Sequence, residues 1–351
     1  MKYSIFSENS DFFDNLLKDM ASAKKKIFIE TYIFNEKKLG AQVNKILARK
    51  ARQGIDVRLL IDAFGNLPLS EFDFAELIKA HGKISFFRRL LVFPVHTLKL
   101  NNRDHRKITI IDDEISYIGS SNIDENTRSW RELNLRVEDF DFNNVLSEIF
   151  LEQYSISNAF IVLRKAKKRH QLGHMEILLS EPFSRNPIRR DYLKMIEKAK
   201  GEIYIENPYF ILDRKLARAF RKAIKRGVEI TFMLPQKTDI TVLNYLNKNS
   251  MSKARRIGAR VLLYPGMIHS KMLLVDRKKW MLGSANLDFR SMYTQFEIMV
   301  KGGEGKICSQ IQKHVEKGME RVSKNGKEFN GFITLKEKIF GKLFYPIRIF
   351  F

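Results

Sequence analysis

The sequence predicts an α/β protein made of two tandem lobes with the same order of elements. Two observations carry this prediction: strand-like segments alternate with helix-like segments, and one arrangement of them occurs once in each half of the chain. The length of 351 residues is enough for about two domains. We expect a first lobe over residues 1–165, a second over 166–330, and a basic, aromatic tail over 331–351.

In the first half, the apolar run 27–34 predicts a strand that follows a helix end rich in Ala and Lys. A basic amphipathic helix comes next and is expected to end at Gly54, because glycine commonly terminates helices. The runs 57–61, 108–111 and 116–118 predict three further strands, and a final helix completes the half.

The second half repeats this order. Its strands are predicted at 203–210, 228–232, 272–275 and 280–282, and Gly227 ends the helix between the first two. The offset between the halves falls from 176 residues at the first strands to 164 further along. A drifting offset indicates a true duplication with insertions and deletions in the loops.

Charge indicates the kind of partner. Lys and Arg exceed Asp and Glu by 63 − 40, which gives a net charge of +23. This excess favours an anionic partner, either nucleic acid, acidic lipid or another phosphate-rich surface. The link between the halves, near 158–176, contains the basic run 164–170. This run is either a solvated linker or a surface that contacts phosphate, and both interpretations stay open.

Composition also excludes several classes. The single cysteine, Cys308, rules out a disulfide scaffold and a Cys-rich zinc site. The acidic residues near the N-terminus do not fit a signal peptide. Because no run of about 18 uncharged apolar residues occurs, we expect no transmembrane helix. The protein is therefore expected in the cytoplasm, or on a membrane surface.

One pattern of polar residues recurs at identical spacing, once per repeat. Its two copies are His105, Lys107, Asp112, Gly119, Ser120 and Asn122, and His269, Lys271, Asp276, Gly283, Ser284 and Asn286. A His and a Lys two residues apart point to the same face of a strand. The glycine is expected to let the backbone approach a ligand, with Ser and Asn facing it. If the halves pair about a pseudo-twofold axis, both copies converge on one cationic pocket.

Such a pocket suits a phosphodiester, whose oxygens are negatively charged. One histidine can attack phosphorus and form a phosphohistidine, while the other protonates the leaving alkoxide and later deprotonates the incoming alcohol or water. The lysines neutralise the charge that develops on the phosphoryl oxygens. This chemistry needs no metal or other cofactor, and we expect none.

Each catalytic histidine needs an acceptor that fixes its tautomer. Glu132 and Glu297, which follow the two motif histidines by 27 and 28 residues, are the candidates. Asp112 and Asp276 stay among the catalytic candidates, although hydrogen bonds that stabilise the fold are the favoured role for both. The remaining histidines lack a repeated partner and are expected to be incidental: His81, His96, His170, His174 and His314.

The duplicated HxKxxxxD…GSxN pattern resembles that of the phospholipase D superfamily, over nearly the whole chain. Finer features are similar to the bacterial cardiolipin synthase branch. They are the segments 29–34, 101–107, 130–132, 267–271, 283–291 and 296–297. The resemblance implies two α/β/α lobes with central mixed sheets, a pseudo-twofold axis and one shared active site. It also implies transfer of a phosphatidyl group between phosphatidylglycerol molecules, with release of glycerol, a phosphohistidine intermediate and no metal.

Two departures from that branch are visible. The chain begins at the catalytic half, without the two N-terminal transmembrane helices common in the branch, and Glu132 stands where Asp is more usual. Lipid contact is then expected from the segment 86–95 or the segment 339–351, which mix aromatic and basic residues. Core packing is the alternative for each. We expect a monomer, peripheral on the cytoplasmic side of the cell membrane, with phosphatidylglycerol as its anionic lipid partner.

Other functions remain open at this point. The same pocket would serve a phosphodiesterase that hydrolyses phospholipid or nucleic acid, and the basic charge suits a nucleic-acid backbone equally well. No recognisable nucleic-acid module accompanies it, so nucleic acid is the less favoured partner. A non-catalytic binding scaffold is disfavoured because both motifs are intact. The near symmetry of the repeat does not identify the nucleophile, and the superfamily resemblance favours His105 weakly.

Overall fold

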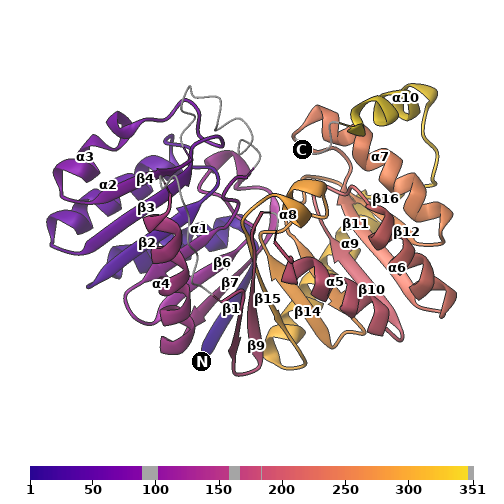
Figure 1. Ribbon diagram of the computed structural model, residues 1–351, viewed down its shortest axis with the longest axis horizontal. Helices are drawn as coiled ribbons and strands as arrows, with labels where there is room; N and C mark the ends of the chain where they lie inside the picture. Colours follow the sequence, from indigo (N-terminus) through magenta and orange to yellow (C-terminus); the bar gives the residue numbers. More distant parts are fainter. Residues whose placement is uncertain (89–101, 158–166, 183, 347–351) are drawn as a thin grey trace.

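The computed structural model describes residues 1–88, 102–157, 167–182 and 184–346, and shows two α/β lobes side by side (Figure 1). Each lobe has a central mixed sheet, in which three strands are parallel and the rest antiparallel. The predicted fold class, two tandem α/β lobes with mixed sheets, is therefore confirmed.

The N-terminal lobe has the strand order β1-β7-β6-β5-β2-β3-β4. Its strands are β1 (Lys2–Glu8), β2 (Lys26–Thr31), β3 (Asp56–Asp62), β4 (Lys83–Phe87), β5 (Ile108–Ile111), β6 (Ile115–Gly119) and β7 (Arg131–Glu138). Its helices are α1 (Asn9–Ser22), α2 (Leu39–Arg52), α3 (Ala75–Lys79) and α4 (Phe140–Ser155), with short 3₁₀ turns η1 (Glu71–Phe74) and η3 (Glu125–Thr127).

The C-terminal lobe has the order β16-β12-β11-β10-β13-β14-β15-β9-β8. Its strands are β8 (Arg169–Leu172), β9 (Met175–Ser180), β10 (Glu202–Glu206), β11 (Glu229–Pro235), β12 (Arg260–Tyr264), β13 (Met272–Val275), β14 (Lys279–Gly283), β15 (Glu297–Gly302) and β16 (Lys327–Glu328). Its helices are α5 (Pro187–Lys198), α6 (Arg214–Lys225), α7 (Thr241–Arg256), α8 (Phe289–Tyr293), α9 (Lys306–Asn325) and α10 (Leu335–Phe344).

The connection between the lobes differs from the expectation of a linker over 158–176. Residues 169–172 and 175–180 form the hairpin β8–β9, which turns at Gly173, where φ is +56°. Glycine adopts this left-handed conformation without the strain of a side chain. The predicted lobe boundary at 165/166 and residues 164–166 of the basic run lie outside the described residues.

One apolar core joins the lobes. It contains side chains from both sheets together with α4 and α9, whereas α1–α3 and α5–α7 pack on the opposite faces of their sheets. Leu135 and Val137 of β7 belong to the same cluster as Trp280 of β14 and Val300 of β15. Burial of this many apolar side chains fixes how the lobes face each other, and so fixes how the two motifs meet.

The two segments expected to contact lipid are partly described. Phe86 and Phe87 are buried in β4, so this start of the segment 86–95 is core, and residues 89–95 lie outside the described residues. Residues 335–344 of the tail form α10, which packs on α7, and residues 347–351 lie outside the described residues. No helix in the described ranges has both the length and the apolarity needed to cross a bilayer.

Candidate active site

The two motifs meet through backbone hydrogen bonds between the lobes. His105 N donates to Phe296 O at 3.0 Å, and His269 N donates to Arg131 O at 2.8 Å. Each bond belongs to an isolated parallel bridge that joins one lobe's motif to the strand start of the other lobe. Because Glu297 follows Phe296 and Glu132 follows Arg131, each bridge carries a carboxylate across to the opposite motif.

The histidine–carboxylate pairs are therefore crossed between the lobes. Glu297 Oε1 lies 3.0 Å from Nδ1 of His105, and Glu132 Oε1 lies 2.7 Å from Nδ1 of His269. All four side chains are buried. A carboxylate on Nδ1 fixes the proton there and leaves Nε2 as the nitrogen that can react. The structure thus pairs the predicted carboxylates with the predicted histidines, but the carboxylate of each pair comes from the repeat that does not contain the histidine.

The motif lysines lie beside the histidines. Lys107 Nζ donates to His105 O at 2.7 Å, and Lys271 Nζ donates to His269 O at 2.6 Å. Burial lowers the pKa of Lys107 to about 7 and that of Lys271 to about 8, although Glu297 and Glu132 favour the charged forms. A buried ammonium without a full counter-charge is well suited to bind an anionic phosphoryl group.

The two pairs differ in charge. Burial raises the pKa of Glu297 despite nearby Lys107, whereas at Glu132 the interaction with His269 outweighs burial and lowers the pKa. Burial lowers the pKa of His269, and it lowers the pKa of His105 far more, with help from the positive charge of Lys107. His105 is therefore held neutral more firmly than His269.

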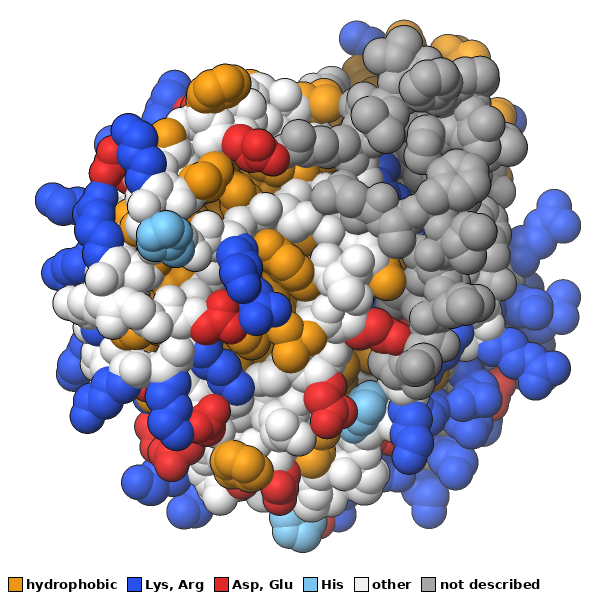
Figure 2. Space-filling model, turned by 60° about the vertical axis from the view of Figure 1, so that its left-hand side comes forward, with side chains coloured by type: hydrophobic (Ala, Val, Ile, Leu, Met, Phe, Trp, Pro, Cys, Tyr) orange, Lys and Arg blue, Asp and Glu red, His pale blue; other side chains and the backbone are white. Residues whose placement is uncertain are grey.

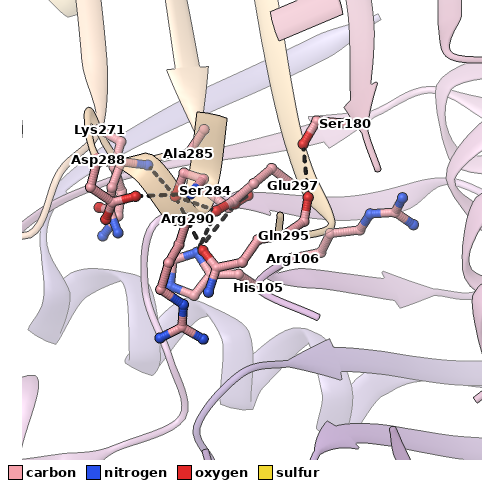
Figure 3. Close-up of polar contacts among 12 residues, drawn as sticks. His105, Arg106, Ser180, Lys271, Ser284, Ala285, Asp288, Arg290, Gln295 and Glu297 are labelled. Atoms are coloured by element: carbon pink, nitrogen blue, oxygen red, sulfur yellow. Dashed lines mark hydrogen bonds and ion pairs between the residues drawn. The ribbon is translucent and has the colours of Figure 1, made fainter. Parts of the chain in front are cut away.

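Hydroxyl groups around Glu297 act against burial, because their hydrogen bonds lower the pKa of this carboxyl. Glu297 accepts a hydrogen bond from the Ser284 hydroxyl in addition to its contact with His105 (Figure 3). It also accepts one from the Ser291 hydroxyl at 2.6 Å. Ser291 Oγ also accepts from Asn286 N at 3.0 Å. These bonds stabilise the carboxylate and spread its charge, which leaves less of it to stabilise a positive His105.

In the first motif, Ser120 and Asn122 bind the backbone, and a hydrogen bond from Ser120 also helps to lower the pKa of Glu132. Ser120 Oγ donates to Leu133 O at 3.2 Å, and Asn122 Oδ1 accepts from Ile33 N at 3.2 Å. The motif glycines also differ from expectation: a Cβ on Gly119 would lie 2.2 Å from an Asn134 side-chain oxygen. The glycine is therefore required by close packing against the next strand rather than by approach to a ligand.

Aromatic rings beside the histidines were not given a role by the sequence. Tyr32 lies edge-on to His105 with ring centroids 5.0 Å apart, and Trp130 lies 5.5 Å from His269. Tyr209 approaches His269 from another side at 6.4 Å. Tyr32 and Tyr209 each lie just after the strand at the start of their repeat, but at the local offset of 176 residues Tyr32 aligns with Pro208, so comparison of the repeats did not reveal them. These rings limit where each imidazole can turn and exclude water from it.

A buried cluster around Glu206 was also missed. Its carboxylate accepts hydrogen bonds from Arg131 at 2.9 Å and from Ser270 at 2.5 Å, and it lies 2.8 Å from His314 Nε2. His314 is thus a fully buried partner rather than an incidental residue. Ser270 and Arg131 each adjoin a residue of the His269–Glu132 pair, so the cluster positions that pair. The signal was the Ile-Glu pair that recurs near the end of β2 and at the end of β10.

Asp112 and Asp276 lie apart from this site, at the far ends of β5 and β13, and their inclusion among the catalytic residues is corrected. Asp112 Oδ1 accepts from the backbone N–H groups of Lys25 and Lys26, at 2.7 and 3.2 Å. Asp276 Oδ1 accepts from Gly201 and Glu202 at 2.7 and 3.1 Å. Both aspartates have φ of +52°, a conformation that Asp tolerates better than most residues. The aspartate therefore recurs because it builds the turn between two strands.

The described residues contain no group of three or more His, Cys, Asp or Glu side chains that could hold a metal ion. The site instead presents two imidazoles and two ammonium groups that converge across the lobe interface. This arrangement suits nucleophilic and acid–base chemistry on a phosphoryl group.

Solved structures share this architecture. The crystal structure of phosphatidylserine synthase from Haemophilus influenzae matches with a TM-score of 0.75 at 14% identity, over 99% of this chain and 93% of that one. Polyphosphate kinase from Porphyromonas gingivalis matches with a TM-score of 0.64 at 12% identity, over 99% of this chain and 53% of that one. At these identities the likeness concerns the fold alone.

Relatives found by sequence identify the family more closely than the structural matches do. A cardiolipin synthase of Listeria innocua is 33% identical over 323 residues, which cover 88% of this chain and 67% of the relative. Cardiolipin synthase 1 of Staphylococcus aureus is 32% identical over 313 residues, 85% of this chain and 63% of the relative. The family model described as cardiolipin synthase, PLD-like domain, matches residues 16–154 and 192–319, and so includes both motifs. The chain therefore belongs to the cardiolipin synthase family of phospholipase D superfamily phosphatidyltransferases.

Proposed function

We propose that this protein transfers a phosphatidyl group from one phosphatidylglycerol molecule to another, and so forms cardiolipin and glycerol. The observation that carries the proposal is the convergence of two histidines, each with its Nδ1 held by a carboxylate of the other lobe, between two buried lysines. The cardiolipin synthase relatives support the choice of lipid substrate.

In the first step, Nε2 of His105 attacks phosphorus, the N–P bond forms, and the bond from phosphorus to the glycerol oxygen breaks. His269 gives its proton to that oxygen, so glycerol leaves as a neutral alcohol. In the second step, His269 takes the proton from the hydroxyl of a second phosphatidylglycerol. The freed oxygen attacks phosphorus and the N–P bond breaks. Lys107 and Lys271 offset the negative charge of the phosphoryl oxygens throughout.

The unequal surroundings of the histidines support these roles. A nucleophile must be neutral, and His105 has the more strongly lowered pKa because of its burial beside Lys107. An acid must carry a proton, and Glu132, whose pKa is lowered by His269, offers a full negative charge at 2.7 Å. The two histidines thus have the pKa order that the two roles require.

We propose an anionic membrane surface as the protein's place of action, on the cytoplasmic side. The net charge of +23 supports attraction to acidic lipid, and Figure 2 shows Lys and Arg side chains around the edges of the side that carries the N-terminal lobe. A monomer is the proposed functional unit, because both motifs and both carboxylates come from one chain.

A product assay tests the proposal. Purified protein would be incubated with phosphatidylglycerol vesicles, and the products identified by mass spectrometry, with His105→Ala as the inactive control. Cardiolipin with an equal amount of glycerol, both absent from the control, is the expected result. Phosphatidic acid without cardiolipin would make the protein a hydrolase of phospholipid. Cleavage of labelled DNA or RNA in a parallel reaction, with the lipid untouched, would assign the charge to nucleic acid.

A further inference from the structure

Helix α10 has two opposite apolar faces, and only one of them is covered. On the covered face, Phe340 and Phe344 pack on Tyr245 of α7, with ring centroids 5.2 and 6.0 Å apart. Gly341 is buried on the same face, where a Cβ would collide with Asn249. Positions three and four residues apart lie on one side of a helix, so these three residues form the face of α10 that packs on α7.

The opposite face is exposed and apolar. Leu335, Ile339 and Leu343 are 73%, 53% and 63% exposed. Their spacing of four residues places them in one stripe along α10. Phe332, just before the helix, is 84% exposed. Exposed large apolar residues are ordinary when scattered, but four of them gathered on ten residues of helix and its entry indicate an interaction surface.

The charges on α10 specify the partner. Lys336, Lys338 and Lys342 are exposed and flank the stripe. Glu337, the single acidic residue of the helix, faces α7, where it pairs with Lys248 and caps the helix through Thr334. The outer face therefore presents apolar side chains bordered by positive charge alone.

We propose that this outer face of α10 docks on an anionic lipid bilayer, with Leu335, Ile339 and Leu343 in the interface and the lysines at the headgroups. An apolar stripe bordered by lysines is the arrangement of interfacial helices. A second copy of the chain is a poorer occupant, because it would bring the same lysines together. The stripe is also far smaller than the roughly 800 Å² per partner of a stable protein interface.

The position of α10 connects this surface to the site. Phe344 and Tyr345, at the end of the helix, pack against the small cluster of Ile211, Leu243 and Leu246. Tyr209 packs against the same cluster and also lies 6.4 Å from the His269 ring. In Figure 1, α10 lies at the upper edge of the C-terminal lobe, above α7. A bilayer held by α10 would therefore lie near the catalytic histidines, which deepens the proposed function by naming what presents the lipid.

Vesicle co-sedimentation tests the docking. The full chain would be mixed with vesicles of phosphatidylcholine alone, or of phosphatidylcholine mixed with phosphatidylglycerol, which gives the surface a negative potential. The Leu335→Ser, Ile339→Ser, Leu343→Ser triple variant should lose about tenfold in partition to anionic vesicles. The Lys336→Gln, Lys338→Gln, Lys342→Gln variant should lose a similar factor at low salt and less at high salt. A matched control, Ile78→Ser, Phe140→Ser, Leu151→Ser, replaces three exposed apolar residues of the N-terminal lobe and should bind as the unaltered chain does.

Two further readouts separate the possible results. Cleavage of a water-soluble phosphodiester should be unchanged in both α10 variants, which shows that the site is intact whether or not the lipid reaction is as proposed. Light scattering after gel filtration reports association of two chains through α10. Equal vesicle binding by the apolar variant and the control would overturn the proposal. So would a dimer that the apolar variant abolishes, because the stripe would then bind a second copy.

Discussion

The two lobes present the same histidine and lysine, but the carboxyl groups beside the two histidines have pKa values shifted in opposite directions. Glu297, beside His105, shares its charge with two hydroxyl groups and has a raised pKa because of burial. Glu132, beside His269, has a pKa that His269 lowers despite burial. Duplication therefore preserved the geometry of the site while its charges diverged. The difference teaches that pseudo-symmetry of position need not mean equality of role.

A second contrast concerns Glu30 and Glu206, the glutamates at equivalent positions of β2 and β10. Glu30 lies 3.9 Å from Arg106, an arginine of its own lobe. Glu206 instead binds Arg131, which comes from the other lobe and immediately precedes Glu132. The Glu206 cluster therefore fastens the two lobes together at the site, whereas the Glu30 contact stays within one lobe.

The largest expected effect comes from removing either histidine. His105→Ala and His269→Ala should each reduce lipid turnover by about 10⁴-fold, because the two act in one reaction. A phosphodiester substrate with a nitrophenolate leaving group distinguishes the nucleophile from the acid, because nitrophenolate departs without accepting a proton. His269→Ala should then release a burst of nitrophenolate and accumulate phosphoenzyme, while His105→Ala should do neither. A burst from His105→Ala alone would reverse the assigned roles.

The crossed carboxylates should show a smaller and unequal effect. Glu132→Gln should reduce turnover by about 10³-fold, because it removes the charge that stabilises a protonated His269. Glu297→Gln should cost about 10²-fold, since two hydroxyl groups already share the charge of Glu297. Steady-state kinetics of both variants give the comparison, and circular dichroism checks their folding. Equal losses of turnover in the two variants would mean that the electrostatic difference between the lobes does not affect the reaction rate.

The interlobe cluster can be tested by stability. Arg131→Met leaves Glu206 buried without its arginine and should cost about 3–5 kcal/mol of unfolding free energy. Arg128→Met is the matched control, because Arg128 pairs with Glu125 and Asp14 near the surface and should cost about 0–1 kcal/mol. Urea unfolding measures both. A similar cost for the two variants would show that the cluster does not hold the lobes together.

The sequence predicted the repeated strands and the residues that converge, because both leave regular signals within one repeat. The crossing of Glu132 and Glu297 could not be read in this way. Their spacings of 27 and 28 residues suit a partner in the same repeat equally well, and only the docking of the lobes decides. The hairpin β8–β9 was missed because β8 is a four-residue edge strand of mainly polar residues that follows a basic run, which resembles a solvated linker.

The lowered pKa values of Lys107 and Lys271 predict a pH dependence of kcat/KM to which the two lobes contribute at different pH. Each lysine loses its charge as pH rises through its lowered pKa, about 7 for Lys107 and about 8 for Lys271. If both charges are needed to bind the phosphoryl group, each lysine should add a loss of about tenfold in kcat/KM per pH unit above its own pKa, beyond the fall that deprotonation of His269 causes. Lys107→Arg keeps its charge and should remove only the loss due to Lys107. A profile that stays flat from pH 7 to 9 would contradict the need for these charges in the free enzyme.

The smallest effect on activity is expected at the motif aspartates, where both lobes should behave alike. Asp276→Asn should leave kcat within about twofold and lower the unfolding free energy by about 1–2 kcal/mol, since the amide is a weaker acceptor for three backbone N–H groups. These bonds outweigh burial and lower the pKa of Asp276, so its contribution is present above the pKa of an unfolded carboxyl and is lost as pH falls through the native value. The difference in stability between the unaltered chain and the variant should therefore shrink below about pH 4.

Asp112→Asn should give the same pattern of retained kcat, because its carboxylate makes the same three contacts in the other lobe. If either variant lost turnover while its stability stayed unchanged, that aspartate would have a role in catalysis, even though it lies at the end of its strand far from the histidine.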